Sequence, residues 1–241
     1  MIPIFSGGRG FIGYPTTIEG LQLWLDAADS STITESSGNV SGWADKSGRS
    51  HNSAQPTGSH QPPYRSTAVN GRPAIGFDSG TTHNLVIPHS TDFDFTSEAT
   101  FIVVSKPTTV AADNQRVLFK DDVWAIGSAS DNSSGRFTNR TIKDYDSDTG
   151  YFVADTPLVW SETFGGTADV TFRKNGALFG TVTGSSNINT STGNVYVGNG
   201  LTTRVAGHDI SEILVYNRVL SSSEMNLVEQ QYLLPKWGIS T

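Results

Sequence analysis

The 241-residue sequence predicts an all-β protein, a two-sheet antiparallel sandwich of the jelly-roll type with one short C-terminal helix. The composition is the first reason: 29 Ser, 27 Thr and 25 Gly stand beside only 16% charged residues, against about 25% in an average soluble domain. Thr suits a half-buried pleated surface, whereas Ser and Gly suit turns. The pattern is the second reason, because at least ten short apolar segments alternate with turn residues and only one segment has helical spacing.

The first predicted strand covers residues 21–25, where Leu21, Leu23 and Leu25 alternate onto one face. Residues 26–72 show little periodicity and are expected to form long loops. Residues 128–150 are polar and acidic and predict a loop or a hairpin. The other predicted strands are 74–78, 85–87, 100–105, 116–119, 123–127, 151–154, 158–164, 169–173, 195–198 and 210–216.

Two local signals are specific. Asn175-Gly176 favours a tight two-residue hairpin turn, because both residues tolerate the positive φ that such a turn requires. Ser221 and Glu224 have the spacing of a capping box that begins a helix. Pro235 is expected to end that helix. Its buried face is predicted to carry Met225, Val228 and Tyr232.

The chain is predicted to contain one domain, residues 19–241, preceded by an arm of residues 1–18. The arm mixes apolar side chains with glycines, so it is expected either to lie on a neighbouring subunit or to form a strap over the protein's own core; an unordered chain start is the other alternative. The predicted anchoring residues are Ile2, Ile4, Phe5, Phe11, Ile12 and Tyr14.

Charge and cysteine content exclude several classes. A formal net charge of −7 with no basic stripe argues against a nucleic-acid partner. The absence of Cys excludes disulfides, thiolate zinc sites and Cys nucleophiles. No apolar run reaches the roughly 18 residues of a membrane span, and residues 1–9 do not have the pattern of a signal peptide. We therefore expect a protein that stays in the cytosol or leaves it within an assembly, without a membrane partner.

The sequence gives no catalytic constellation. Its seven Glu residues do not form the pair of acids that a glycoside hydrolase needs; Glu162 is the nearest candidate and is expected to face outward from its strand. There is no Gly-x-Ser-x-Gly elbow, and the five His residues have no zinc-ligand spacing.

Two binding candidates remain. Acidic residues at alternate positions predict a calcium site formed by Asp144, Asp146, Asp148 and Asp155. The alternative for these residues is an acidic hairpin tip. Trp43, at the start of a long loop, is a candidate for stacking on a sugar ring, whereas Trp24 and Trp237 are expected in the core.

Several motifs together resemble the laminin-G-like, concanavalin A-like jelly-roll domains of bacteria and their phages. The resemblance runs from about residue 20 to residue 238, and its motifs are LWLDAAD at 23–29, WADKSG at 43–48, NGRPAIGFD at 70–78, VTFRKNG at 170–176, VYVG at 195–198, ISEILVYNR at 210–218 and YLLPKWG at 232–238. The resemblance implies a fold that binds glycans or proteins through loops at one rim, with calcium in some members. It does not by itself assign an activity.

These observations lead to one main hypothesis and two alternatives. The main hypothesis is a non-enzymatic structural protein of a phage virion, a surface decoration, fibre or spike component, with capsid or tail proteins as partners and host surface glycan as a further contact. It would be assembled in the host cytoplasm, and it could form a homo-oligomer. The alternatives are a free-standing bacterial glycan-binding module and, with less support, a glycoside hydrolase.

Overall fold

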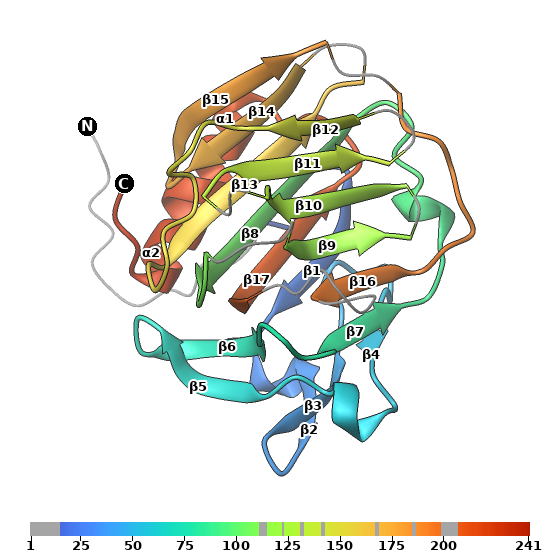
Figure 1. Ribbon diagram of the computed structural model, residues 1–241, viewed down its shortest axis with the longest axis vertical. Helices are drawn as coiled ribbons and strands as arrows, with labels where there is room; N and C mark the ends of the chain where they lie inside the picture. The colour runs from blue at the N-terminus through green and yellow to red at the C-terminus, as the bar shows by residue number, and fades with distance from the viewer. Residues whose placement is uncertain are drawn as a thin grey trace.

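The computed structural model describes residues 15–110, 115–121, 123–130, 133–140, 143–166, 169–184, 187–198 and 207–241. They form two antiparallel sheets that face each other, as the sequence predicts (Figure 1). Sheet A contains β1 (Leu21–Asp26), β5 (Tyr64–Val69), β6 (Arg72–Phe77), β8 (Ala99–Pro107), β13 (Leu158–Phe164), β14 (Asp169–Lys174), β15 (Ala177–Thr183) and β17 (His208–Tyr216). Sheet B contains β2 (Ile33–Ser36), β3 (Asn39–Trp43), β4 (Ser53–Ala54), β7 (Asn84–Ile87), β9 (Arg116–Lys120), β10 (Trp124–Ser128), β11 (Gly135–Asn139), β12 (Lys143–Asp146) and β16 (Val195–Gly198). Three 3-10 turns are η1 (Ser30–Thr32), η2 (Gly58–His60) and η3 (Thr91–Phe93).

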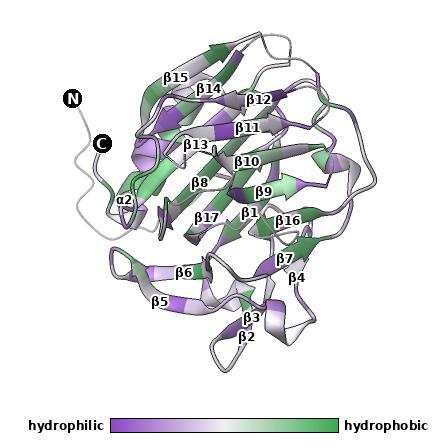
Figure 2. Cartoon of the chain, in the orientation of Figure 1, coloured by the Kyte–Doolittle hydropathy of each residue, from purple (hydrophilic) through white to green (hydrophobic). Residues whose placement is uncertain are grey.

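The order of strands shows how distant segments meet. Sheet A runs β15-β14-β13-β8-β17-β6-β5, and β1 shares the β6 side of β17. Sheet B runs β12-β11-β10-β9-β16-β7-β4-β3-β2. The central strands β8, β13 and β17 are largely hydrophobic, whereas polar residues are more frequent on the edge strands β5 and β12 (Figure 2).

Two segments differ from the sequence prediction. Residues 26–72 contain four short strands, β2 to β5, rather than long loops. β2 and β5 are the edge strands of their sheets, and β3 and β4 are short inner strands that follow β2 in the order of sheet B. All four are short, and β2 and β5 carry many exposed polar side chains, so they do not show the alternation of apolar residues that predicts a strand. Residues 151–154, predicted as a strand, form no strand, although Tyr151 and Phe152 are buried.

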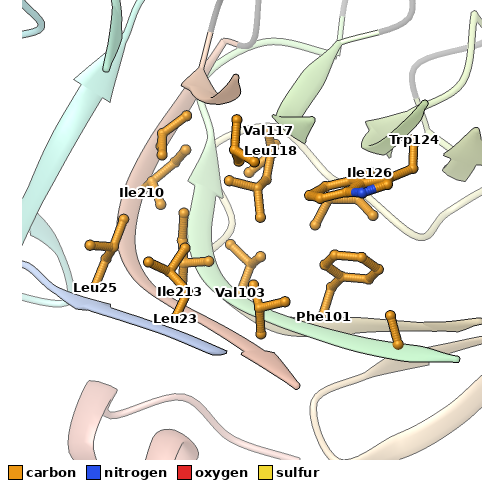
Figure 3. Close-up of a cluster of buried hydrophobic side chains, with 14 of the residues drawn as sticks. Leu23, Leu25, Phe101, Val103, Val117, Leu118, Trp124, Ile126, Ile210 and Ile213 are labelled. Carbon is orange, nitrogen blue, oxygen red and sulfur yellow. The ribbon is translucent and has the colours of Figure 1, made fainter. Parts of the chain in front are cut away.

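The main core fills the space between the sheets. Figure 3 shows Leu23 and Leu25 of β1, Phe101 and Val103 of β8 and Ile213 of β17 pointing toward side chains of the opposite sheet, which include Leu118, Trp124 and Ile126. Burial of this apolar surface is the main favourable term in folding.

A second core lies between the outer face of sheet A and the C-terminal helix. The helix consists of α1 (Ser222–Asn226), the π-helical segment η4 (Leu227–Leu233) and α2 (Leu234–Trp237). The Ser221–Glu224 capping box is present, and the three residues predicted for the buried face are buried. Pro235 does not end the helix: it follows the π-helical segment at the start of α2, and Gly238 with φ +62° ends the helix instead. No helix in the described ranges is long and apolar enough to cross a bilayer.

Glu212 of β17 holds the end of this helix. Its buried carboxylate accepts hydrogen bonds from the Trp24 and Trp237 indoles at 2.7 and 2.6 Å, and it binds the Tyr232 hydroxyl and the Lys236 ammonium, both at 2.7 Å. Trp237 is fully buried, as predicted, and Trp24 is partly buried. These contacts join β1, β17 and α2.

The six predicted anchoring residues, Ile2 to Tyr14, lie outside the described residues, so the arm stays a prediction. Of residues 1–18 the structure describes only 15–18. Ile18 packs in the second core, and the Tyr216 hydroxyl donates to the Pro15 carbonyl. These four residues are therefore part of the domain.

Candidate functional site

Strand β17 contains a bulge that places two of its acids, Asp209 and Glu212, on the outer face of sheet A. Asp209 pairs with Lys106 of β8, and Glu212 pairs with Val104, so residues three apart on β17 oppose residues two apart on β8. The extra residue keeps Asp209 and Glu212 on the same face. Glu212 lies beneath the C-terminal helix, whereas Asp209 lines an open groove.

This groove, which we call the polar groove, has a volume of about 630 Å³. It is formed by the edge strand β5, the end of β6, the end of β8 and the start of β17. Its lining consists of Tyr64, Arg65, Ser66, Thr67, Ala68, Asp78, Lys106, Thr108 and Asp209. Loops and strands from four separate parts of the chain therefore build one surface.

An ion network forms the floor of the polar groove. The Arg65 guanidinium binds Asp209 through Nη1 and Asp78 through Nη2, the latter at 2.5 Å. Lys106 Nζ lies 3.1 Å from the second oxygen of Asp209. The Asp209 side chain is only 3% exposed, while those of Arg65 and Asp78 are 32% and 35% exposed. The buried carboxylate thus fixes the two cations, and the groups around it still meet solvent.

The local charges are well defined. Burial opposes the charge of Arg65, but its hydrogen bonds to Asp78 and Asp209 outweigh this and raise the pKa of Arg65. Burial lowers the pKa of the nearby His83, so His83 is neutral at pH 7. Gly76 leaves room for the network, since a Cβ there would lie 2.6 Å from Cζ of Arg65.

Several polar groups of the groove keep free hydrogen-bonding capacity. Asp78 Oδ2 has only His83 nearby, at 3.8 Å, which is beyond hydrogen-bond distance. Lys106 carries three donors, of which one is directed at Asp209. Ser66 and Thr67 are exposed on β5, with hydroxyls that both donate and accept. A ligand rich in hydroxyl groups meets fixed partners of both kinds here.

A second groove of about 390 Å³ lies between strands β13 to β15 and α1. Leu178 and Val219, two of the three exposed large hydrophobic residues in the described chain, line it at 62% and 39% exposure. This lining suits an apolar contact better than a hydroxyl-rich ligand.

The prediction for Trp43 is wrong. Its side chain is 1% exposed and packs in the core between the sheets, so it offers no face to a sugar ring. The turn residues near Trp43 suggested a loop, but Trp43 is the last residue of strand β3. The loop that follows is held against the domain by Asp45, whose carboxylate accepts hydrogen bonds from the backbone amides of Trp24, Ser47 and His51.

Glu162 also differs from its prediction. It is fully buried rather than outward-facing, and its strand neighbours Trp160 and Phe164 belong to the core between the sheets. Burial, with a smaller effect of Asp146, raises the pKa of Glu162 well above its ordinary value. Neither carboxyl oxygen makes a hydrogen bond of full geometry, although the nearby Gly127 backbone has a smaller effect that lowers the pKa. Without access to solvent, this acid is no candidate for catalysis.

The predicted calcium ligands do not converge. Asp144 and Asp146 lie on the edge strand β12, where Arg136 of β11 binds them at 2.8 and 2.6 Å. Asp148 is exposed beyond the end of β12, and the Asp155 backbone is bound to the Pro107 carbonyl. Across the described residues, no group of three or more His, Asp or Glu side chains is placed to hold a metal ion. The acidic hairpin alternative describes this segment better.

One serine–histidine pair occurs outside the grooves. The Ser105 hydroxyl lies 3.1 Å from His208 Nδ1, and the Trp160 indole donates to the same hydroxyl at 2.9 Å. Both residues are buried, and burial lowers the pKa of His208 to about 3. The pair lacks a carboxylate and a path to substrate, so it is structural.

The groove residues were not among the predicted site residues. Arg65, Asp78, Lys106 and Asp209 are far apart in the sequence, and each is a single charge within a strand or at its end. The local signal was that charged residues are few in this chain and that these four stand beside apolar strands. Such a residue is expected to have a partner of opposite charge, but the sequence does not show which residue that partner is.

Comparisons with known proteins support the fold. No protein-family model and no curated protein matches the sequence. Among solved structures, the binding domain of Paraclostridial Mosquitocidal Protein 1 has 14% identity and a TM-score of 0.66; the match covers 89% of this chain and 52% of that one. Domain 4 of the arabinanase AbnA from Geobacillus stearothermophilus, solved with arabinotriose, has 13% identity and a TM-score of 0.63, covering 87% and 98%. The binding domain of Botulinum Neurotoxin DC, in complex with SialylT, has 12% identity and a TM-score of 0.60, covering 88% and 51%. The chain thus spans about half the length of the two toxin binding domains and nearly all of the AbnA domain.

Proposed function

We propose that this protein is a glycan-binding module without catalytic activity, and that the polar groove is its binding site. The observation that carries the proposal is the groove itself, in which a buried carboxylate fixes two cations beside free hydroxyl and carboxylate groups. A saccharide presents alternating donors and acceptors, which such fixed polar groups recognise. The structural neighbours, which include a domain solved with arabinotriose and toxin binding domains, support this choice over the other functions considered.

The arrangement of the acids supports binding rather than hydrolysis. Asp78 and Asp209 are the two carboxylates that line the groove, and one guanidinium binds both. A glycoside hydrolase needs one of its two acids protonated, as general acid, and the other ionised. Here Arg65 lies between the two carboxylates and binds both, so they do not face each other across an open space that a glycosidic bond could occupy.

The virion hypothesis stays a prediction. Its anchoring residues lie outside the described part of the chain, and the partners, the oligomer and the location it names depend on them. A glycan-binding module is compatible with display on a virion, so the virion hypothesis and the proposed function both include binding of a host glycan.

A glycan array tests the proposal, followed by titration calorimetry with the strongest ligand. Thr67→Trp adds a large side chain at an exposed position inside the groove and is expected to abolish binding. Thr181→Trp, at an exposed position on β15, the opposite edge strand of the same sheet, is the matched control and should bind normally. No binding to any glycan, or release of reducing sugar from the bound glycan, would contradict the proposal.

A further inference from the structure

The charges that line the polar groove cancel. Arg65 and Lys106 supply two positive charges, and Asp78 and Asp209 supply two negative ones; these four are the charged side chains among the lining residues. His83 adds none at neutral pH because burial keeps it uncharged. The groove is therefore strongly polar yet has no net charge.

Both cations are already bound to carboxylates. Asp209 uses one oxygen for Arg65 and the other for Lys106, and Asp78 takes the second arm of the guanidinium. An anionic ligand would have to displace these carboxylates or lie close to them. Breaking a partly buried charge pair leaves a charge without a partner, which is costly. The formal net charge of −7 on the whole chain adds long-range repulsion of anions.

The free capacity of the groove suits uncharged hydroxyl groups. Asp78 Oδ2 accepts, the remaining Lys106 protons donate, and the Ser66 and Thr67 hydroxyls do both. Two adjacent sugar hydroxyls can donate to Asp78 and accept from Lys106 at the same time. Such hydrogen bonds to charged groups are stronger than those between neutral groups.

On these grounds we propose that the polar groove selects uncharged saccharides, through adjacent hydroxyl groups that contact Asp78 and Lys106, and discriminates against saccharides that carry a carboxylate. This inference rests on the proposed function, because it concerns the same groove. A protein that binds acidic sugars would need an Arg or Lys side chain that is not already paired with a carboxylate of the protein. The inference therefore distinguishes this protein from that class.

The test compares neutral glycans with the same glycans carrying sialic acid, first on an array and then by titration of the strongest neutral glycan and its sialylated counterpart. We expect the neutral member to bind at least tenfold more tightly. Its affinity should change less than about twofold between low and high salt, because no ionic contact to the ligand is screened. A preference for the sialylated member, or binding that weakens steeply with salt, would overturn the inference and leave the proposed function intact.

Asp78→Asn provides the decisive variant. It removes one negative charge from the groove, replaces the free acceptor Oδ2 by a donor and weakens the bond to Arg65, so binding of the neutral glycan should fall roughly tenfold or more, while binding of the sialylated counterpart should improve. Asp92→Asn is the matched control. Like Asp78, Asp92 binds one Arg, Arg49, and lies beside one His, His51; its side chain is 34% exposed, but it lies outside the groove.

The outcomes are separable. If Asp78→Asn and Thr67→Trp both fold, as their melting curves will show, and both bind the neutral glycan like the natural protein, the binding site lies elsewhere and the inference is wrong although the protein binds glycan. If the natural protein binds neither neutral nor acidic glycans, the proposed function fails, and the inference fails with it.

Discussion

Replacement of Glu162 by Met is expected to stabilise the protein. Glu162 is fully buried between the sheets, next to Trp160 and Phe164 on the same face of β13, and its two oxygens make no hydrogen bond of full geometry, with only the Gly127 backbone near enough to affect its pKa. A buried polar group without a partner costs about 1–3 kcal/mol. Met has a similar length and no polar hydrogen, so Glu162→Met removes this cost, while its extra volume of about one methylene offsets part of the gain.

The expected gain is about 1–3 kcal/mol in the free energy of unfolding. For a domain of this size it corresponds to a rise in Tm of about 2–4 °C for each kcal/mol. The gain should already be present at pH 5, where the buried carboxyl is protonated, because the unpaired hydroxyl is the source of the cost. Glu162→Gln keeps polar hydrogens in the same place and should give no comparable gain at that pH.

The Gln variant isolates the effect of ionisation. Because burial raises the pKa of Glu162 in the folded state, the folded protein keeps a proton that the unfolded chain loses above about pH 4.5. The pH-dependent part of the free energy of unfolding that comes from Glu162 is therefore fully present below about pH 4.5. It is lost as the pH rises toward the folded-state pKa of Glu162. The loss is about 1.4 kcal/mol per pH unit within this window, and Glu162→Gln lacks it.

Urea unfolding from pH 5 to pH 9 measures both effects. The stability of Glu162→Gln relative to the natural protein should increase with pH, and Glu19→Gln, which changes an exposed Glu, should follow the natural protein. If the natural protein and Glu162→Gln have the same pH dependence, the carboxyl is solvated in the folded state. If Glu162→Met loses more than about 1 kcal/mol, the carboxyl has favourable partners and the reasoning is wrong.

Three further predictions concern the stability of the fold and the predicted calcium site. Glu212→Ala should destabilise the protein by about 2–4 kcal/mol in urea unfolding, because it leaves the Trp24 and Trp237 indoles without their acceptor, while Lys236 keeps its ion pair with Asp26; a loss below 1 kcal/mol would mean that the helix end does not depend on this carboxylate. Gly176→Ala should lower stability by about 1–2 kcal/mol in the same assay, because Gly176 has φ +80° in the β14–β15 turn and a Cβ there would lie 2.8 Å from the Gln230 side chain; an unchanged midpoint would contradict this. Calcium should leave the melting curve unchanged, since Arg136 already binds Asp144 and Asp146; a rise in Tm that Asp146→Asn removes would restore the calcium site.

The sequence predicted the fold where periodicity and turn chemistry agree. The Asn175-Gly176 turn has the expected positive φ at both residues, and the strands on either side form with the predicted pairing. The Ser221–Glu224 box begins the helix as expected. Strands β2 to β5 were not predicted because they are short strands at or near a sheet edge, for which pairing rather than burial decides the conformation.

Period-two alternation would have placed Glu162 correctly. Trp160, Glu162 and Phe164 alternate on β13, so they share a face, and the two aromatic residues assign that face to the core. The outward assignment followed the general rule that Glu is exposed. The polar groove was beyond such reasoning, because Arg65 and Asp209 are 144 residues apart and meet only through the order of the strands.

The buried acids of sheet A show why the groove is the candidate site. Four buried acids of the described chain lie on the outer side of the sheet, and each has a cationic partner: Asp26 with Lys46 and Lys236, Asp209 with Arg65 and Lys106, Glu212 with Lys236, and Glu229 with Arg173. The pairs of Glu212 and Glu229 hold the C-terminal helix against the sheet, and their cations are each 17% exposed. The pair of Asp209 lies beyond the helix, with cations that are 32% and 22% exposed. A paired, buried charge contributes little net stability by itself, and this one joins strands of the sheet rather than the helix and opens to solvent, which is the ground on which the polar groove is proposed as the binding site.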